Sequence, residues 1–295
     1  MLVTMKEMLQ DAKKNKYAIP AFDVSNYEMM KSVLEACEEE KSPALLMGLE
    51  VDFCGKNMKL ITEMVKSAAA LFKIPVCFHL DHAANFDLIK TGIASGFSSV
   101  MYDGSVLPFK ENAENTREIV CYAHKKGVTV EAELGHVGNA MVGNEADKVL
   151  NENPEDTLTL ADEAKQFIDI TGADALAVAI GTAHGIYPKN MKPELKLDLL
   201  KTIRDTVNIP LVLHGGSSNP DSEIAESVKI GISKINISSD IKFAFYKKCR
   251  EVLEENPKWI EPNAIYPPCI EAMREVVEFK MNLFNDIGKA SLYNK

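Results

Sequence analysis

A carboxylate stands between two imidazoles in the octapeptide from Val76 to Ala83, Val-Cys-Phe-His-Leu-Asp-His-Ala. The apolar and aromatic residues of Val76–Leu80 predict a buried strand, and Asp81 and His82 come where we expect it to give way to a loop. A carboxylate beside a metal ligand suits metal-assisted proton transfer, because the ion polarises a substrate while the carboxylate moves a proton. A solvated Asp–His pair at a strand end is the plainer interpretation of this octapeptide.

Three of the six histidines follow predicted strands, namely His82, His184 and His214. The carboxyl ends of barrel strands converge on one mouth, so these imidazoles are predicted to meet there. Three imidazoles with open positions are typical of a catalytic zinc site, although imidazole also suits cobalt and nickel. The alternative is that each histidine is a hydrogen-bonded strand cap.

Glycines and hydroxyls follow the last two predicted strands, in the turns from His214 to Ser218 and from Asn236 to Ser239. The loops after strands seven and eight of a barrel often bind phosphate, and glycines let backbone N–H groups approach the anion. Gly185, just after His184, is expected to complete the ring of donors. The alternative is an ordinary pair of glycine turns.

A metal ion beside a phosphate cradle suits a small ketose phosphate as substrate. The ion would stabilise an enediolate, and a carboxylate would shuttle the proton of the hydroxyl where the carbon–carbon bond breaks. No lysine stands at the end of strand six to form a Schiff base, and Lys234 opens strand eight rather than closing it. The residues therefore favour metal-dependent aldol cleavage.

The elements that must position these residues alternate between strand and helix. Eight strand segments in about 240 residues predict an α/β fold, a (β/α)8 TIM barrel in one domain over residues 1–295. Further helices at about 243–255 and 271–284 are expected to pack on the barrel or on a neighbouring subunit. The predicted strands are 18–22, 44–47, 76–80, 99–102, 128–133, 175–180, 210–214 and 234–237.

The bulk composition excludes several classes of partner. The net charge of -10, with no concentrated basic stretch, argues against nucleic acid. No apolar run approaches the roughly 20 residues that span a bilayer, and residues 1–16 do not form a signal peptide. The six cysteines lie far apart without a CxxC pair, which favours a reducing cytoplasm.

Five segments resemble the class II, zinc-dependent ketose-bisphosphate aldolases, in the right order and over nearly the whole chain. The resemblance is closest to the tagatose-bisphosphate-aldolase-like branch and extends to the class II fructose-bisphosphate aldolases. It implies a carbon–carbon lyase of carbohydrate metabolism, as in glycolysis, that releases dihydroxyacetone phosphate and an aldehyde. The matching segments are His79–His82, Val130–Gly135, Ala179–Gly185, Leu213–Ser217 and Lys234–Ile237.

The resemblance also implies a role for each matching residue. His82, His184 and His214 would hold the catalytic Zn2+, and Asp81 would donate the proton to the cleaved hydroxyl. Asp103 and Glu133 match a second divalent metal position, and a monovalent cation often accompanies such sites. Relatives are homodimers or homotetramers. The residues implied to bind dihydroxyacetone phosphate are Gly185, Gly215, Gly216, Ser217, Asn236, Ile237, Ser238 and Ser239.

Several positions depart from the family pattern. Asp23 stands where family members often have asparagine, and no acid precedes Glu145 in the loop that usually carries one for proton exchange. Ile270 replaces the arginine that binds the distal phosphate in the fructose-bisphosphate branch, with Arg274 nearby. The sequence therefore leaves open whether the substrate sugar carries a second phosphate.

Two other functions remain open from the sequence. A metal-dependent sugar-phosphate epimerase or isomerase would use two acids on opposite faces of an enediolate, and Asp81 with Glu133 fit that pattern. A degraded sugar-phosphate-binding protein would explain the missing acidic loop, although the three histidines and Asp81 argue against it.

Overall fold

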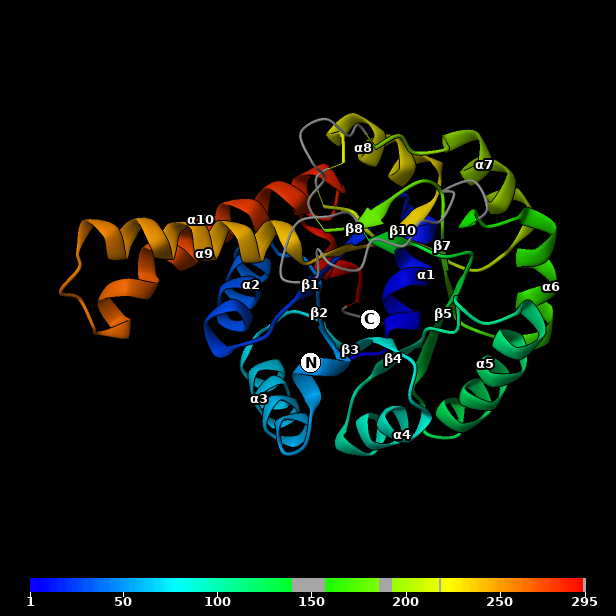
Figure 1. Ribbon diagram of the computed structural model, residues 1–295, viewed down its shortest axis with the longest axis horizontal. Helices are drawn as coiled ribbons and strands as arrows, with labels where there is room; N and C mark the ends of the chain where they lie inside the picture. Colours follow the sequence, from blue (N-terminus) through cyan, green and yellow to red (C-terminus); the bar gives the residue numbers. More distant parts are fainter. Residues whose placement is uncertain (140–156, 186–192, 218, 294–295) are drawn as a thin grey trace.

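Eight parallel strands form a closed barrel in the computed structural model, which describes residues 1–139, 157–185, 193–217 and 219–293 (Figure 1). The order around the barrel is β1-β10-β9-β7-β5-β4-β3-β2, so the first and last strands pair. The predicted (β/α)8 barrel is confirmed. Its strands are β1 Ile19–Asp23, β2 Ala44–Leu49, β3 Val76–Ala83, β4 Ser99–Tyr102, β5 Thr129–Leu134, β7 Ala175–Val178, β9 Leu211–Leu213 and β10 Ile232–Ile237.

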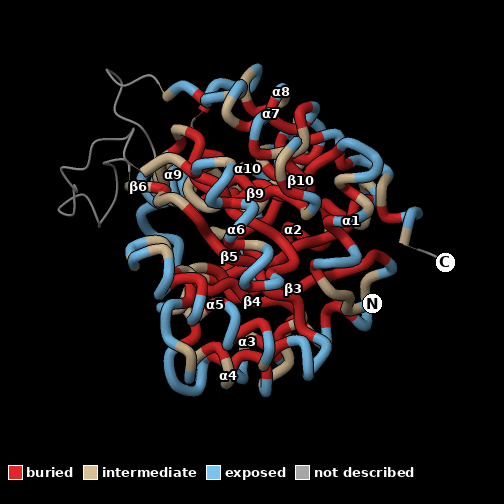
Figure 2. The backbone as a smooth tube through the Cα atoms, turned by 90° about the vertical axis from the view of Figure 1, so that its right-hand side faces the viewer, coloured by how far each residue is buried: buried red, intermediate tan, exposed pale blue. Residues whose placement is uncertain are grey.

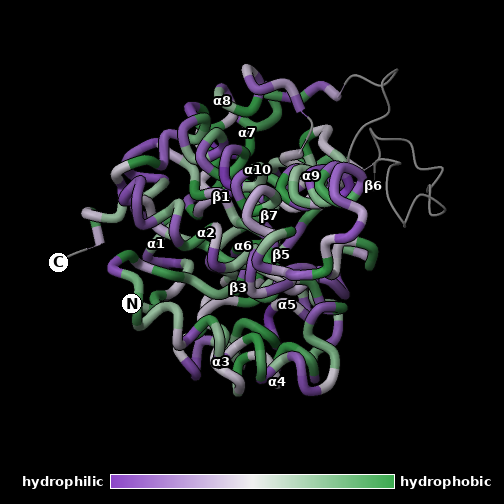
Figure 3. Tube along the Cα trace, turned by 90° about the vertical axis from the view of Figure 1, so that its left-hand side faces the viewer, coloured by the Kyte–Doolittle hydropathy of each residue, from purple (hydrophilic) through white to green (hydrophobic). Residues whose placement is uncertain are grey.

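A ring of helices covers the outside of the barrel (Figure 1). The outward residues of the strands are apolar because both faces of the sheet are buried. Phe78 and Leu80 of β3, for example, lie in the core between barrel and helices. Figure 2 shows the strands buried inside the more exposed outer segments, and Figure 3 shows hydrophobic and hydrophilic residues interspersed along the chain. The helices are α2 Tyr27–Glu39, α3 Asn57–Leu71, α4 Phe86–Ser95, α5 Phe109–His124, α6 Ala161–Thr171, α7 Leu197–Thr206 and α8 Asp221–Ile230, with the short 3-10 helix η1 Glu50–Phe53 after β2.

Helix α1, Met5–Asn15, closes the barrel at the amino ends of the strands. Thr4 caps the helix in a capping box with Glu7, which fixes its start. Its apolar face packs on inward-pointing residues of several strands in a separate core cluster, and the Lys6 amide donates to Thr129 Oγ1 at the start of β5. Helix α1 therefore covers the amino end of the barrel interior.

Two helices follow the last strand, α9 Ser239–Glu255 and α10 Pro262–Leu283, before the 3-10 helix η3 Lys289–Tyr293. They pack on each other and extend beyond the barrel as an arm (Figure 1). Both start earlier than predicted. Helix α9 begins directly at the end of β10, and α10 begins with a proline at its first turn and includes Pro267 and Pro268. Packing against α9 outweighs the helix-breaking tendency of these two prolines.

Strand β3 also runs further than predicted, because Asp81 and His82 belong to it instead of the following loop. A two-stranded pair, β6 Gly138–Asn139 with β8 Ala183–His184, lies outside the barrel sheet and carries His184. Among the described residues, no helix is long and apolar enough to cross a membrane.

Candidate metal centre and active site

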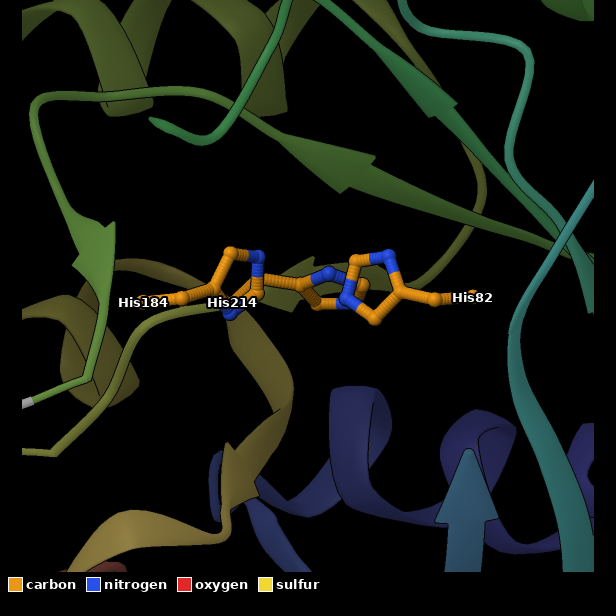
Figure 4. A group of neighbouring side chains, drawn as sticks. All are labelled: His82, His184 and His214. Atoms are coloured by element: carbon orange, nitrogen blue, oxygen red, sulfur yellow. The ribbon is translucent and has the colours of Figure 1, made fainter. Parts of the chain in front are cut away.

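Three histidines from separate segments meet at the carboxyl end of the barrel (Figure 4). His82 comes from β3 and His184 from β8, and His214 directly follows β9. One nitrogen from each ring lies within 4.8 Å of the others. The ring centroids are 4.6 to 5.8 Å apart, and none of the rings is stacked face to face on another. The structure therefore brings together the three residues that the sequence predicts as zinc ligands.

The backbone of His82 is unusual, and this conformation brings its ring to the mouth. Alternation along β3 places His79 and Asp81 on one face of the strand, so a regular strand would send His82 to the other face. His82 instead has φ 46°, in the left-handed region that non-glycine residues rarely adopt. The pairing of β3 with β4 also shifts register between Leu80 and Ala83. This bulge lets two successive residues, Asp81 and His82, both serve the site.

The His214 ring is held from below by a carboxylate. Its Nε2 lies 2.9 Å from Glu131 Oε1, and both side chains are fully buried. Its Nδ1 lies 3.3 Å from Glu133 Oε2. Burial alone would lower the pKa of His214, but these two carboxylates raise it to about 10. Metal binding at Nδ1 must therefore displace a proton in competition with the acids.

His184 is tied to His214 through the backbone that precedes it. Thr182 Oγ1 donates to the His214 carbonyl at 2.8 Å. Gly215 has φ 63° and lies so close to Ala183 that a Cβ there would be 2.5 Å from the Ala183 carbonyl oxygen. This close approach explains why glycine follows the third histidine. Burial and the neighbouring imidazoles of His82 and His214 lower the pKa of His184, which keeps its ring neutral and able to bind a metal.

The donor set fits a divalent metal ion. His82 Nε2 and His214 Nδ1 are buried and have no hydrogen-bond partner among the described residues. A buried polar atom without a partner is costly, and a metal ion would satisfy both nitrogens. The other nitrogens are bonded to carboxylates, as metal-ligating imidazoles commonly are, since His82 Nδ1 lies 2.8 Å from Asp103 Oδ2. Three imidazoles on a mouth open to substrate match a catalytic zinc site.

Asp103 and Glu133, predicted for a second metal position, also lie beside His82, with ligand atoms from the three residues within 4.8 Å. Asp103 is anchored by Ser105, whose hydroxyl donates to Oδ1 at 2.7 Å and lies 3.0 Å from His136 Nδ1. His136 thereby contacts the site through Ser105. Glu133 Oε1 accepts from the Val137 amide at 3.1 Å, while its buried Oε2 has no hydrogen-bond partner among the described residues.

Asp81 is 2% exposed and is held from two sides. Asn236 Nδ2 lies 3.1 Å from each of its carboxylate oxygens, and His79 Nε2 lies 3.6 Å from Oδ1. Burial alone would raise the pKa of Asp81, but the nearby imidazoles and Lys234 hold it well below its usual range. Asp81 is therefore an ionised acceptor fixed in orientation beside the metal ligands.

The predicted phosphate-binding residues also gather at the mouth. Asn219 Nδ2 donates to the carbonyls of Gly215 and Ser217 at 2.5 and 3.1 Å, which ties together the turn that contains Gly216. Ser239 is the first residue of α9, so the first amides of this 17-residue helix have no partner within it. The strand β10 ends at Ile237, which brings Asn236 and the α9 start to the same edge.

The hydroxyl of Ser238 is already engaged, because it donates to Asp23 Oδ2 at 2.7 Å. Lys242 Nζ lies 2.5 Å from the same oxygen, so Asp23, singled out from the sequence, forms an ion pair. Gly185 has φ 96° and is the last residue of the described segment 157–185. The described residues do not include Ser218. They also do not include the loop segment 140–156, which contains Glu145.

Sequence reasoning missed the residues that support the ligands. Glu131 and Lys234 form a buried ion pair below His214, with Nζ 2.9 and 3.1 Å from the two carboxylate oxygens. Burial alone would raise the pKa of Glu131, but Lys234 and His214 lower it to about 2. Arg274, considered for the distal phosphate, instead pairs with Glu278 at 2.7 Å and with Glu39.

A parallel (β/α)8 barrel with three imidazoles and an acid at its carboxyl mouth defines a class of metal-binding TIM-barrel enzymes. The family model described as fructose-bisphosphate aldolase class-II matches residues 3–289. The chain therefore belongs to the class II fructose-bisphosphate aldolase family, whose members are aldolases and are generally metal-dependent.

Solved structures of similar proteins agree with this family. The YdjI aldolase from Escherichia coli K12 is 33% identical, with 98% of this chain and 100% of that chain covered and a TM-score of 0.84. A putative fructose-1,6-biphosphate aldolase from Coccidioides immitis is 28% identical, with 97% of each chain covered and a TM-score of 0.84. The fructose-bisphosphate aldolase Fba from Campylobacter jejuni shares the fold, with 23% identity, 98% and 96% coverage and a TM-score of 0.81.

Proposed function

We propose that this aldolase uses zinc and reversibly cleaves a ketose phosphate into dihydroxyacetone phosphate and an aldehyde. The observation that carries the proposal is the pair of buried ring nitrogens, His82 Nε2 and His214 Nδ1, that have no hydrogen-bond partner among the described residues and lie beside His184 and the ionised Asp81. A Lewis acid and a proton acceptor are the two groups that aldol cleavage requires when no Schiff-base lysine is available.

Each group of this chain has a part in the proposed reaction. The bound ion would polarise the ketose carbonyl and offset the negative charge that develops there. Asp81 accepts the proton of the hydroxyl at which the carbon–carbon bond breaks, and returns it in the condensation direction. The electron pair of the broken bond stays on the carbon of the dihydroxyacetone phosphate half, which takes up one proton from water as Asp81 gives its own back to water. Asn236 keeps the Asp81 carboxylate from rotating, because its amide donates to both oxygens. Helix α1 packs under the opposite end of the barrel, away from these residues.

Binding of the substrate phosphate is assigned to the turns after β9 and β10. Gly215 and Gly216 let backbone amides approach an anion, and the amides at the start of α9 add further donors. The Asp23–Lys242 pair lies beside these donors. The carboxylate there is neutralised by the ammonium, so the pair does not repel the phosphate as a free acid would.

The test combines zinc content with release of dihydroxyacetone phosphate from a panel of tagatose and fructose bisphosphates and 1-phosphates. We expect Asp81→Ala to lose cleavage by at least about 100-fold, the scale of general acid–base catalysis, while zinc stays bound. The control is Asp198→Ala on α7, whose side chain is 98% exposed and which should keep full activity.

Cleavage by Asp81→Ala at the wild-type rate would rule out the assigned role. Bound zinc without release of dihydroxyacetone phosphate from any sugar would favour an epimerase or isomerase. Absence of both zinc and release would favour a sugar-phosphate-binding protein.

A further inference from the structure

An ion pair lies in the barrel interior, one layer below the candidate metal ligands. Lys234 of β10 and Glu131 of β5 are both fully buried, and the ammonium lies within 3.1 Å of both carboxylate oxygens. Removing two charges from water costs several kcal/mol per ion, and apolar residues of similar size are often at least as stabilising. The pair is therefore poorly explained as a contribution to stability, and its contacts point to the site above.

The carboxylate of Glu131 serves two partners at once. Its Oε1 contacts both Lys234 and His214 Nε2, at 3.1 and 2.9 Å. A carboxylate can only accept, and the contact of Nε2 with Glu131 at 2.9 Å is a hydrogen bond whereas the 3.3 Å contact of Nδ1 with Glu133 is not. The hydrogen of a neutral His214 ring therefore resides on Nε2, and the lone pair is left on Nδ1. Nδ1 is the nitrogen that lacks a hydrogen-bond partner among the described residues. Glu131 thereby selects which ring nitrogen of His214 is available to a metal ion.

Lys234 determines how Glu131 presents that oxygen. His79 Nε2 lies 3.8 Å from Glu131 Oε2 and offers a competing partner. With Nζ bonded to both oxygens, the plane of the carboxylate is fixed and Oε1 stays under His214. Two residues further along the same face of β10, Asn236 holds both oxygens of Asp81 in the same manner. One strand therefore orients two acids in successive layers.

We propose that Lys234 is a positioning residue of the metal centre, which acts through Glu131 to hold His214 with Nδ1 toward the ion. This inference rests on the proposed metal-dependent function, and Lys234 itself touches neither metal nor substrate. It predicts that the barrel interior, and not only the three ligands, sets the affinity for zinc.

The test measures zinc affinity of the metal-free protein by competition with a chromophoric chelator. Lys234→Met should weaken zinc binding about 10- to 100-fold, as loss of an outer partner of a ligand commonly does. The matched control is Lys280→Met, which breaks another largely buried ion pair, Lys280 with Asp240 at 2.8 Å in the α9–α10 arm. That control should lose stability without losing zinc affinity.

Lys234→Met removes the ammonium from Glu131, leaves this buried carboxylate hydrogen-bonded to His214, and can prevent folding. The double variant Lys234→Met with Glu131→Gln removes both charges and should fold. The glutamine amide at position 131 is no longer fixed under His214, because Lys234 is gone, so we again expect weaker zinc binding. The absorption bands of the cobalt-substituted protein should shift, because the ligand field depends on the His214 orientation.

Either folded variant binding zinc as tightly as the wild type, with unshifted cobalt bands, would overturn the role of Lys234. Wild-type protein without zinc affinity would overturn the proposed function as well. Wild-type binding with unaffected variants would overturn this inference alone.

Discussion

At the scale of single residues, Asp286 has a buried carboxyl group that makes no hydrogen bond within the described part of the chain. It is fully buried after α10, and neither carboxylate oxygen has a partner among the described residues. Its backbone is well anchored, since its carbonyl accepts from Ser42 Oγ at 3.1 Å. Burial raises the pKa of Asp286 well above its usual value, and Lys289 offsets only part of that rise.

This raised pKa makes stability depend on pH. The unfolded carboxyl loses its proton near pH 4, while the folded one keeps it to a higher pH, so the folded state binds more protons in between. The contribution of this carboxyl to the stability of the folded protein is fully present below about pH 4, where the group is protonated in both states. That contribution is lost as the pH rises through the pKa of the folded state. Asp286→Asn should therefore gain stability over the wild type by up to about 1.4 kcal/mol for each pH unit in that window.

Urea unfolding of both proteins from pH 4.5 to 8 measures the effect. Asp169→Asn on α6, with a side chain 68% exposed, serves as the control and should show no such trend. A difference between Asp286→Asn and wild type that stays constant with pH would contradict the assignment.

Residue types at strand ends were sufficient to predict His82, His184, His214 and Asp81 as neighbours, because the barrel brings its strand ends together. Their supports were not predictable in the same way. Lys234 and Glu131 are 103 positions apart, and nothing local to either residue reveals the other. The bulge at His82 was also hidden, since strand alternation alone places Asp81 and His82 on opposite faces.

At the scale of elements, the segments after β7 and β9 are held together by the close approach of Ala183 and Gly215. Gly215→Ala would force a Cβ onto the Ala183 carbonyl in addition to the left-handed backbone strain of about 1–2 kcal/mol. We expect a loss of stability beyond that strain, and weaker zinc binding because His184 and His214 move apart. Chemical unfolding and a zinc titration measure the two effects.

Gly127 provides the matched control for this substitution. It has φ 71° but no atom within 4 Å of the added Cβ position, so Gly127→Ala carries the backbone strain without the collision. Its zinc affinity should equal that of the wild type. The explanation fails if the two variants lose the same stability and both keep full affinity.

Apolar runs bounded by turns located all eight strands, and Ser99–Tyr102 was predicted to the residue. The prediction was less accurate where tertiary contacts override local rules. Helix α10 includes two prolines that locally disfavour a helix, and His184 lies in the two-residue strand β8, which is too short to leave a pattern in the sequence.

At the scale of the whole molecule, the α9–α10 arm extends from the barrel and exposes apolar side chains (Figure 1). At its tip Ile260 is 81% exposed and Trp259 is 44% exposed, and Phe243 and Tyr246 of α9 are about half exposed. Large apolar and aromatic residues on an exposed projection are typical of a surface that another chain covers. We propose that the arm is the contact between subunits of a homodimer or homotetramer.

Light scattering coupled to size exclusion tests this assembly. The wild type should elute as an oligomer, and Trp259→Asp combined with Ile260→Asp should shift it toward the monomer by introducing charge into the contact. Ile170→Asp, at a 43% exposed apolar position on α6, is the control and should leave the mass unchanged. A wild-type monomer, or an unchanged mass in the double variant, would exclude the arm as the interface.

The pairing of β1 with β10 determines when the site becomes complete as the chain folds. Ala21 opposes Asn236 across this seam, and the Ala18 amide donates to the Phe284 carbonyl at 3.0 Å. Contacts between residues so distant in sequence are entropically demanding and form slowly. Because Asn236 orients Asp81 and Lys234 holds Glu131, neither of these two acids is oriented in a growing chain until its last strand has been synthesised. A partly made protein is thus inert, and its chemistry begins only after the first and last strands have joined.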